Sequence, residues 1–143
     1  METEAKDTTF ALNETAVFKS LKFTATEIKE STGTQYLKPE NGNVFVGVKF
    51  TIENTSDEAQ TVSTILLFDG YCDDVKAEYS FTGATVFDEG TLDGDVAPGK
   101  KLVGWYALEV PEDWTNIELH VKSDWLSDST GVFVFEKTST VSQ

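Results

Sequence analysis

Very few side chains in this sequence could carry out acid-base or nucleophilic chemistry. Its 143 residues include one histidine, His120, and one cysteine, Cys72. His120 alternates with Leu119 and Val121, so in a strand its ring points away from the face that buries those two side chains, and we expect it on the surface. Cys72 follows Tyr71 in an acidic turn, where negative charge raises the pKa of a thiol. Neither residue is expected to be catalytic.

The other polar residues form no catalytic or cofactor-binding motif. Serine and threonine are frequent, but there is no Gly-x-Ser-x-Gly elbow, no Ser-x-x-Lys pair and no glycine-rich phosphate loop. A lone cysteine gives neither an internal disulfide nor a zinc motif. Nothing in the sequence places two carboxylates across a cleft at a separation suited to acid-base catalysis. The sequence therefore predicts a protein that is not an enzyme and has no cofactor.

Two acidic stretches raise the question of calcium, which takes about six to eight oxygen ligands on flexible loops. The first stretch contains two glycines, Gly90 and Gly94, and four carboxylates, Asp88, Glu89, Asp93 and Asp95. The second, which is the weaker candidate, contains Asp69, Asp73, Asp74 and Glu78. Neither follows the ordered spacing of an EF-hand loop. A solvated hairpin loop is the alternative interpretation of the first stretch, and we predict no metal site.

Charge restricts the range of partners. The chain has 25 acidic and 11 basic residues and a formal net charge of -14. Nucleic-acid binding draws most of its affinity from clustered lysine and arginine, so DNA and RNA are excluded as expected partners. The same charge opposes adsorption to anionic lipid and is compatible with basic partners or cations.

Hydrophobic residues alternate with polar ones along most of the chain, which is the periodicity of strands with one buried face. The clearest case is Val44, Val46, Val48, Phe50 and Ile52. Strands are expected at residues 21–28, 44–53, 61–68, 75–82, 101–110, 116–121 and 131–136. Their expected core includes Val46, Val48, Phe50, Leu108, Leu119 and Val121. Turn-forming clusters separate the strands, and at most one helical turn is expected, near residues 111–114 or 124–127. The pattern predicts an all-β, immunoglobulin-like antiparallel β-sandwich of seven to eight strands.

This sandwich is expected to occupy residues 10–137 as one domain. Residues 1–9 are predicted to be a flexible acidic tether, and residues 138–143 a frayed tail. No segment approaches the length of an apolar membrane span, and Met1–Asp7 lacks the features of a signal peptide.

Three segments together resemble a known family. They are Leu12–Val17 (LNETAV), the strand and turn of residues 42–56 (GNVFVGVKFTIENTS), and the turn VAPGK at 96–100 followed by GWYALEVP at 104–111. In this order they resemble the domain of unknown function 4352 family, immunoglobulin-like domains of secreted lipoproteins of Gram-positive bacteria. The resemblance spans roughly residues 10 to 136. It implies that a signal peptide and a lipid-bearing cysteine precede the domain in the family, and it implies no catalytic residue.

Together, the residues and the resemblance predict a non-catalytic extracellular or cell-surface lipoprotein domain. It would bind an unknown protein or cell-envelope component or serve as a spacer, and it would contact a membrane only through a lipid anchor outside this sequence. A small-ligand-binding lipoprotein and an enzyme with an acidic loop site are the alternatives.

The candidate binding residues are large apolar side chains in polar loops, namely Tyr36, Trp125 and Leu126. Such side chains on loops at the ends of a sandwich are suited to anchoring a partner. They can equally fold back as plugs over the open end of the sandwich, and the sequence leaves both possibilities open.

Overall fold

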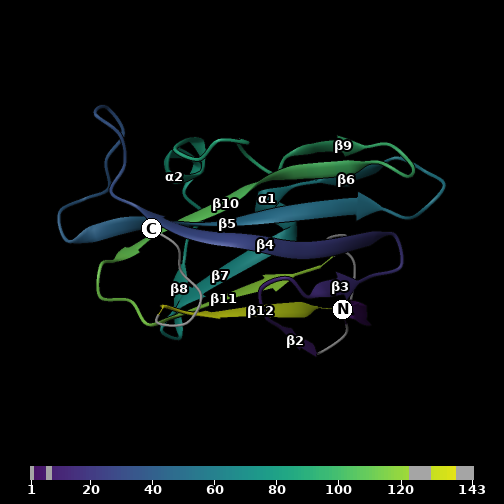
Figure 1. Ribbon diagram of the computed structural model, residues 1–143, viewed down its shortest axis with the longest axis horizontal. Helices are drawn as coiled ribbons and strands as arrows, with labels where there is room; N and C mark the ends of the chain where they lie inside the picture. The colour runs from purple at the N-terminus through teal and green to yellow at the C-terminus, as the bar shows by residue number, and fades with distance from the viewer. Residues whose placement is uncertain (1, 6–7, 123–129, 138–143) are drawn as a thin grey trace.

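The computed structural model describes residues 2–5, 8–122 and 130–137. In these residues the chain forms short and long strands and two short helices (Figure 1). The strands are β1 (Glu2–Glu4), β2 (Thr8–Phe10), β3 (Thr15–Val17), β4 (Leu21–Ser31), β5 (Asn43–Asn54), β6 (Gln60–Val62), β7 (Phe68–Cys72), β8 (Val75–Ala77), β9 (Gly94–Val96), β10 (Lys101–Pro111), β11 (Asn116–Val121) and β12 (Gly131–Glu136). The helices are α1 (Thr64–Leu67) and α2 (Phe81–Thr85).

The strands form a β-sandwich, as the hydrophobic alternation predicted. Sheet A has the order β1-β3-β4-β5-β10, sheet B has the order β2-β12-β11-β7-β8, and β6 pairs with β9 in a separate two-stranded ribbon. The two larger sheets lie face to face in Figure 1, with the ribbon at one end of sheet A. More strands form than the predicted seven to eight, because several short strands extend the edges of both sheets.

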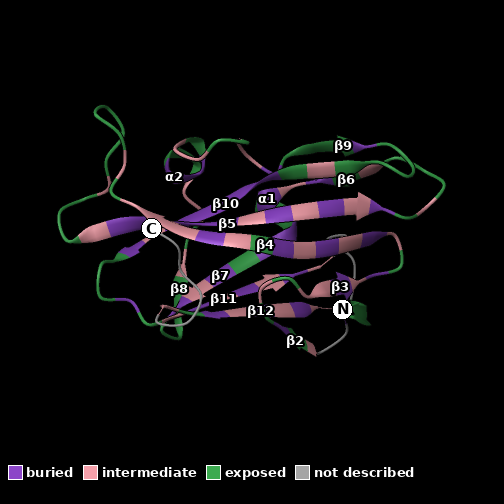
Figure 2. Ribbon diagram, in the orientation of Figure 1, coloured by how far each residue is buried: buried purple, intermediate pink, exposed green. Residues whose placement is uncertain are grey.

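The core lies between the sheets, where the alternating residues of the long strands meet. Strand β5 pairs with β4 and, without interruption from Asn43 to Glu53, with β10. All six residues expected in the core are buried (Figure 2). Buried and partly exposed residues alternate along much of β4, whereas β5 and β10 each contain five consecutive buried residues. Aromatic rings from the two sheets interlock, with Phe50 edge-on to Phe68 and Phe133 at centroid separations of 5.3 and 5.2 Å.

Two of the predicted strands were wrong in part, since residues 61–68 contain α1 and residues 75–82 end in the first residues of α2. In each case a serine begins the helix: the Ser63 Oγ accepts a hydrogen bond from the Leu66 amide, and the Ser80 Oγ accepts one from the Gly83 amide. Such caps satisfy amides that a strand would pair in its ladder. Near residues 111–114, where at most a helical turn was expected, the chain makes a hydrogen-bonded turn after β10, with the Trp114 amide donating to the Pro111 carbonyl at 3.1 Å, and no helix. Residues 124–127 lie outside the described residues.

The N-terminal segment departs from the expected tether wherever the structure describes it. Strand β1 pairs in parallel with β3, and β2 pairs in parallel with β12. Ala5, between the two strands, is buried in the core. The tail at 138–143 lies outside the described residues. No helix of the described residues is long and apolar enough to cross a membrane.

Asn54, at the end of β5, is a buried polar residue with a full set of hydrogen bonds. Its Nδ2 donates to the carbonyl oxygens of Glu58 and Val96 at 2.7 and 2.8 Å. Its Oδ1 accepts from the amide and the hydroxyl of Ser56 at 2.9 and 2.7 Å. The Asn54 carbonyl also accepts from the Gly99 amide. One side chain therefore joins the turn after β5 to the turn before β10.

Replacing Asn54 by alanine is expected to lower the free energy of unfolding by roughly 2–4 kcal/mol, because the buried Val96 carbonyl and the Ser56 amide lose their side-chain partner and the Glu58 carbonyl loses one of its two donors. Urea denaturation followed by tryptophan fluorescence measures the change. Thr55→Ala, which removes an exposed neighbouring side chain, is the matched control and should change stability little. A midpoint for Asn54→Ala equal to that of the control would contradict the role assigned to Asn54.

A strap formed by residues 81–92 covers the outer face of sheet A. The ring of Phe87 stacks on Trp105 at a centroid separation of 4.6 Å and lies directly over Gly47, where a Cβ atom would come within 2.5 Å of it. Trp105 Nε1 donates to Glu89 Oε1 at 2.8 Å, and Lys49 forms an ion pair with the same carboxylate. Gly47 thus makes room for the strap, and the carboxylate fixes it.

Candidate functional site

Tyr36 lies in the loop between β4 and β5, which projects from the body of the sandwich in Figure 1. Its side chain is 86% exposed, and that of Leu37 is 39% exposed. The Thr34 hydroxyl accepts hydrogen bonds from both of their amides. Tyr36 therefore does not plug the end of the sandwich, and its role as a partner anchor stays a prediction. Trp125 and Leu126 lie outside the described residues.

The four carboxylates considered as calcium ligands do not share their partners. Those that bind described residues each bind different ones. Glu89 binds the strap to Trp105 and Lys49, and both contacts lower the pKa of its carboxyl, the indole hydrogen bond most. Asp93 accepts from the amide and hydroxyl of Thr64, and Asp95 accepts from Thr61. Asp88 is exposed.

In the second acidic stretch, Asp73 accepts from the Thr115 hydroxyl and the Asn116 amide. Within residues 2–5, 8–122 and 130–137, no three Asp, Glu, Cys or His side chains lie where they could hold one metal ion.

His120 lies where its position in the sequence predicted, whereas Cys72 ends strand β7 and does not lie in the expected turn. His120 is partly exposed on the outer face of sheet B, where its ring tilts against Tyr71 and its Nε2 lies 3.1 Å from Glu118 Oε1. Cys72 is buried. Burial, with the negative charge of Asp73, raises the pKa of its thiol to about 11. The thiol is therefore protonated at neutral pH, a state unsuited to a nucleophile.

Alkylation of Cys72 by iodoacetamide is expected to be slow at pH 8 and to accelerate up to about pH 11. At pH 8 a thiol of pKa 11 has about two hundredfold less thiolate than one of ordinary pKa. Mass spectrometry of timed samples at several pH values measures the rate, and the chain unfolded in urea is the control. A rate at pH 8 equal to that in urea would show that burial does not protect the thiol.

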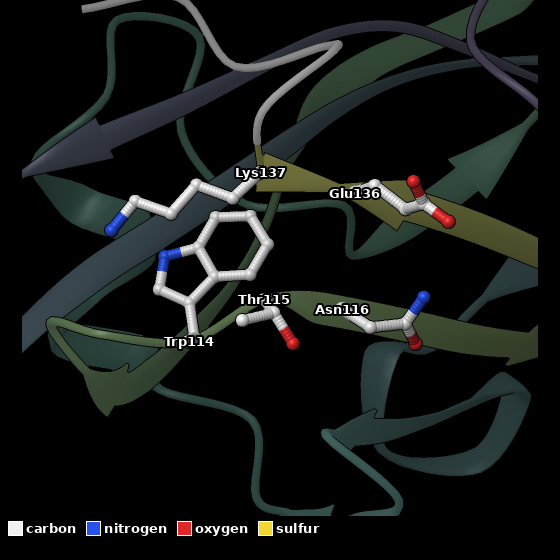
Figure 3. Close-up of a pocket in the computed structure, with 5 residues that line it drawn as sticks. All are labelled: Trp114, Thr115, Asn116, Glu136 and Lys137. Atoms are coloured by element: carbon white, nitrogen blue, oxygen red, sulfur yellow. The ribbon is translucent and has the colours of Figure 1, made fainter.

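One pocket lies where β11 begins and β12 ends, lined by Trp114, Thr115, Asn116, Glu136 and Lys137 (Figure 3). Its two largest side chains already serve the fold. The indole of Trp114 is buried and donates to Glu30 Oε1 at 2.7 Å, and Lys137 Nζ pairs with the same oxygen at 2.9 Å. The Lys137 amine also lies over the Trp114 ring at 5.5 Å. This cluster joins β4 to the start of β11 and to the end of β12.

A second pocket, the tyrosine pocket, lies at the side of the sandwich where edge strand β8 of sheet B meets edge strand β10 of sheet A. The chain leaves β8 and crosses to β10, with Tyr79 forming a bridge to Leu108. The pocket has a volume of about 330 Å³ and is lined by Thr64, Ile65, Phe68, Asp69, Gly70, Lys76, Ala77, Glu78, Tyr79 and Tyr106. Four elements therefore build it: α1, β7, β8 with the residues after it, and β10.

Three stacked aromatic rings form the inner wall of this pocket. Tyr106 stacks on Phe68 at a centroid separation of 4.8 Å, and Tyr79 tilts against Tyr106 at 5.0 Å. Tyr106 is only 2% exposed. Burial against the core fixes these rings, so the two phenol groups have defined positions at the seam between the sheets.

The two tyrosine hydroxyls differ in their surroundings. Tyr106 lines the pocket, and its hydroxyl has no hydrogen-bond partner among the described residues. The Tyr79 oxygen is enclosed, and an interaction with the Thr64 hydroxyl offsets a small part of the rise in its pKa. Burial is the main cause that raises the pKa of both phenols, followed by the charge of Asp69 at Tyr106 and of Asp93 at Tyr79. Both phenols are thus neutral at pH 7, and each can donate and accept.

Charged residues surround these hydroxyls at the rim. Asp69 pairs with Lys76 at 2.6 Å, and Glu78 forms no ion pair with a described residue. The pocket thus offers a neutral hydroxyl, aromatic surface and an excess of negative charge. None of its lining residues carries a thiol or an imidazole.

The hydrophobic alternation does not distinguish Tyr79 or Tyr106 from ordinary core residues, because both fall on the apolar positions of an alternating pattern. The signal available in the sequence was the choice of tyrosine itself, since phenylalanine would fill such a core position equally well without a hydroxyl.

Comparisons with known proteins agree on the architecture. A model of the domain of unknown function DUF4352 matches residues 10–131. The uncharacterized protein YxkC of Bacillus subtilis (strain 168) is 27% identical over 128 residues, which cover 82% of this chain and 68% of that protein.

Solved structures share the sandwich. A candidate lipoprotein of Bacillus subtilis, ycdA, has a TM-score of 0.71 at 14% identity and covers 87% of this chain. An uncharacterized β-sandwich protein of Clostridium difficile 630 has a TM-score of 0.62 at 18% identity, covering 94% of this chain and 97% of its own. A candidate lipoprotein of Staphylococcus aureus has a TM-score of 0.62 at 16% identity, covering 89% and 90%. At such identities the likeness shows the fold alone. This chain spans only 39% of the length of the first of these structures.

Proposed function

Because this chain belongs to the family of the domain of unknown function DUF4352, we propose that it is a non-catalytic binding domain that works outside the cytoplasmic membrane on a lipid-anchored protein. The tyrosine pocket carries the binding part of this proposal. Buried hydroxyls normally have partners, so the phenol of the buried Tyr106, which lines the pocket without a partner among the described residues, is suited to a ligand that supplies one. Ligand pockets are typically apolar with a few convergent polar groups, and this pocket has that composition.

The chemistry of the groups present supports a purely binding role. A neutral phenol with a raised pKa is a weak base and a weak nucleophile. The histidine lies on the outer face of sheet B, and the cysteine is buried and protonated. The family itself carries no assigned activity.

The proposed location rests on the relatives. Two of the similar structures are described as candidate lipoproteins of Gram-positive bacteria. An acidic, well-solvated surface is compatible with exposure to the cell exterior, and a lipid anchor would lie outside this sequence. One relative is much longer than this chain, which favours a module within a larger surface protein.

Tyr36 supports a second candidate function, the binding of a protein or envelope partner by the loop between β4 and β5. Its large exposed side chain projects from an ordered loop, which is how aromatic anchors are presented at interfaces. A spacer without a ligand is the remaining possibility, and it would leave both the pocket and this loop without a role.

The proposed location predicts that protease added to intact cells of the source organism digests this domain. Immunoblots of the full-length protein, before and after treatment, measure its loss, and a cytosolic enzyme is the control for lysis. Complete protection of the domain in intact cells, with digestion only after lysis, would contradict the extracellular location.

The proposed binding site predicts saturable binding of at least one class of small polar molecule. Ligand-observed NMR with separate mixtures of amines, sugars, carboxylates and nucleosides tests the wild type and the Tyr106→Phe variant. Binding should be lost in that variant and kept in Tyr36→Phe, which removes a hydroxyl far out on a loop. The absence of binding by every class would contradict a small-molecule role for the pocket.

A further inference from the structure

We propose that the tyrosine pocket binds a primary ammonium group, such as the end of a small aliphatic amine or of a lysine side chain. The inference rests on the proposed binding function and names the chemical class of its ligand. It is drawn from the charges, the hydrogen-bonding groups and the size of the pocket.

The charges around the pocket select a cation. The carboxylates whose charges act on the two phenols are Asp69, Glu78 and Asp93, and the cation among the lining residues, Lys76, is paired with Asp69. The pocket therefore holds a net negative charge, on a protein whose formal charge is -14. An anionic ligand would be repelled there, whereas an organic cation would be attracted both at long range and at the rim.

The hydrogen-bonding groups select a primary ammonium among cations. An ammonium group has three N–H donors and no acceptor. The pocket offers it acceptors in the phenol oxygen of Tyr106 and in the carboxylate of Glu78. A quaternary ammonium cannot donate to either of these, and a neutral alcohol can donate but carries no charge for the carboxylates to attract. Aromatic surface beside the phenols also favours a cation.

The size and rim of the pocket select a small aliphatic chain. Its volume of about 330 Å³ is near the lower end for ligand pockets. Ile65 lines the pocket and is 80% exposed, so it offers an apolar contact for methylene groups that lead out to solvent. A lysine side chain or a short diamine has this form, with a charged end and an apolar stem.

The test is a titration of the ¹⁵N-labelled protein with cadaverine and with 1,5-pentanediol, a neutral molecule of the same chain length. A phosphate buffer of low ionic strength avoids competing amines. Cadaverine should saturably shift the amide signals of residues 64–70, 76–79 and 104–108, and pentanediol should not. Tetramethylammonium, which carries the charge without N–H donors, should bind more weakly than cadaverine.

Variants separate specific binding from general attraction to an acidic surface. Tyr106→Phe should weaken cadaverine binding about tenfold or more, since the lost acceptor served a charged donor. Glu78→Gln should weaken it severalfold, whereas Glu40→Gln removes an equal charge in the loop between β4 and β5 and should leave it unchanged. Glu78 and Glu40 are exposed, so both single variants are expected to fold normally. The urea midpoint of every variant is measured alongside.

Each further outcome decides the proposal. Equal binding of pentanediol would overturn the ammonium assignment and leave a binding pocket in place, as would binding of sugars or carboxylates without amines. Cadaverine shifts spread over the acidic surface and unchanged in the tyrosine variant would also overturn it. Tight binding of Nα-acetyl-lysinamide together with weak binding of cadaverine would identify a lysine side chain as the source of the ammonium group.

Discussion

The long strand β10 lies at the edge of sheet A, and the need to cover its open side determines much of the structure around it. A strand edge exposes unpaired amide and carbonyl groups, which invite pairing with another chain. Here the chain itself satisfies several of them: the Ser80 amide donates to the Ala107 carbonyl, and the Trp105 amide donates to the Gly90 carbonyl. The segment from β8 to β9 therefore bonds to this edge twice, at Ser80 just before the strap and at Gly90 near the end of the strap.

This covering requires small residues where backbones approach closely. At Gly104 a Cβ atom would come within 2.7 Å of the Thr91 carbonyl oxygen, and at Gly83 one would meet Phe45 at 2.9 Å. Gly104 belongs to the segment by which the chain resembles its family, so one function of that motif is to admit the strap. The remaining edges are strands of three residues each, β1, β2 and β8, too short to offer a long ladder to another chain.

The long strands were predictable because a period of two over ten residues leaves little ambiguity about which face is buried. Residues 61–92 were predicted less well, since their alternation continues where Ser63 and Ser80 begin helices and where the chain crosses between sheets. Periodicity identifies a buried face but not the element that covers it. The tyrosine pocket arises between α1, β7, β8 and β10, so its location depends on contacts between distant segments that no local pattern encodes. Asn54 was identified as a turn residue, but its burial and its bond to Val96 depend equally on a distant turn.

Hydrogen-bond accounting distinguishes the polar groups that serve the fold from those available for a ligand. Asn54 satisfies each of its side-chain groups, and Glu30 joins the buried indole of Trp114 to Lys137. Tyr106 differs, because phenylalanine at this position would keep the stacking on Phe68 and remove a hydroxyl that no described residue satisfies. Tyr106 lines the pocket, so a ligand with hydrogen-bond donors would supply the partner that the fold does not.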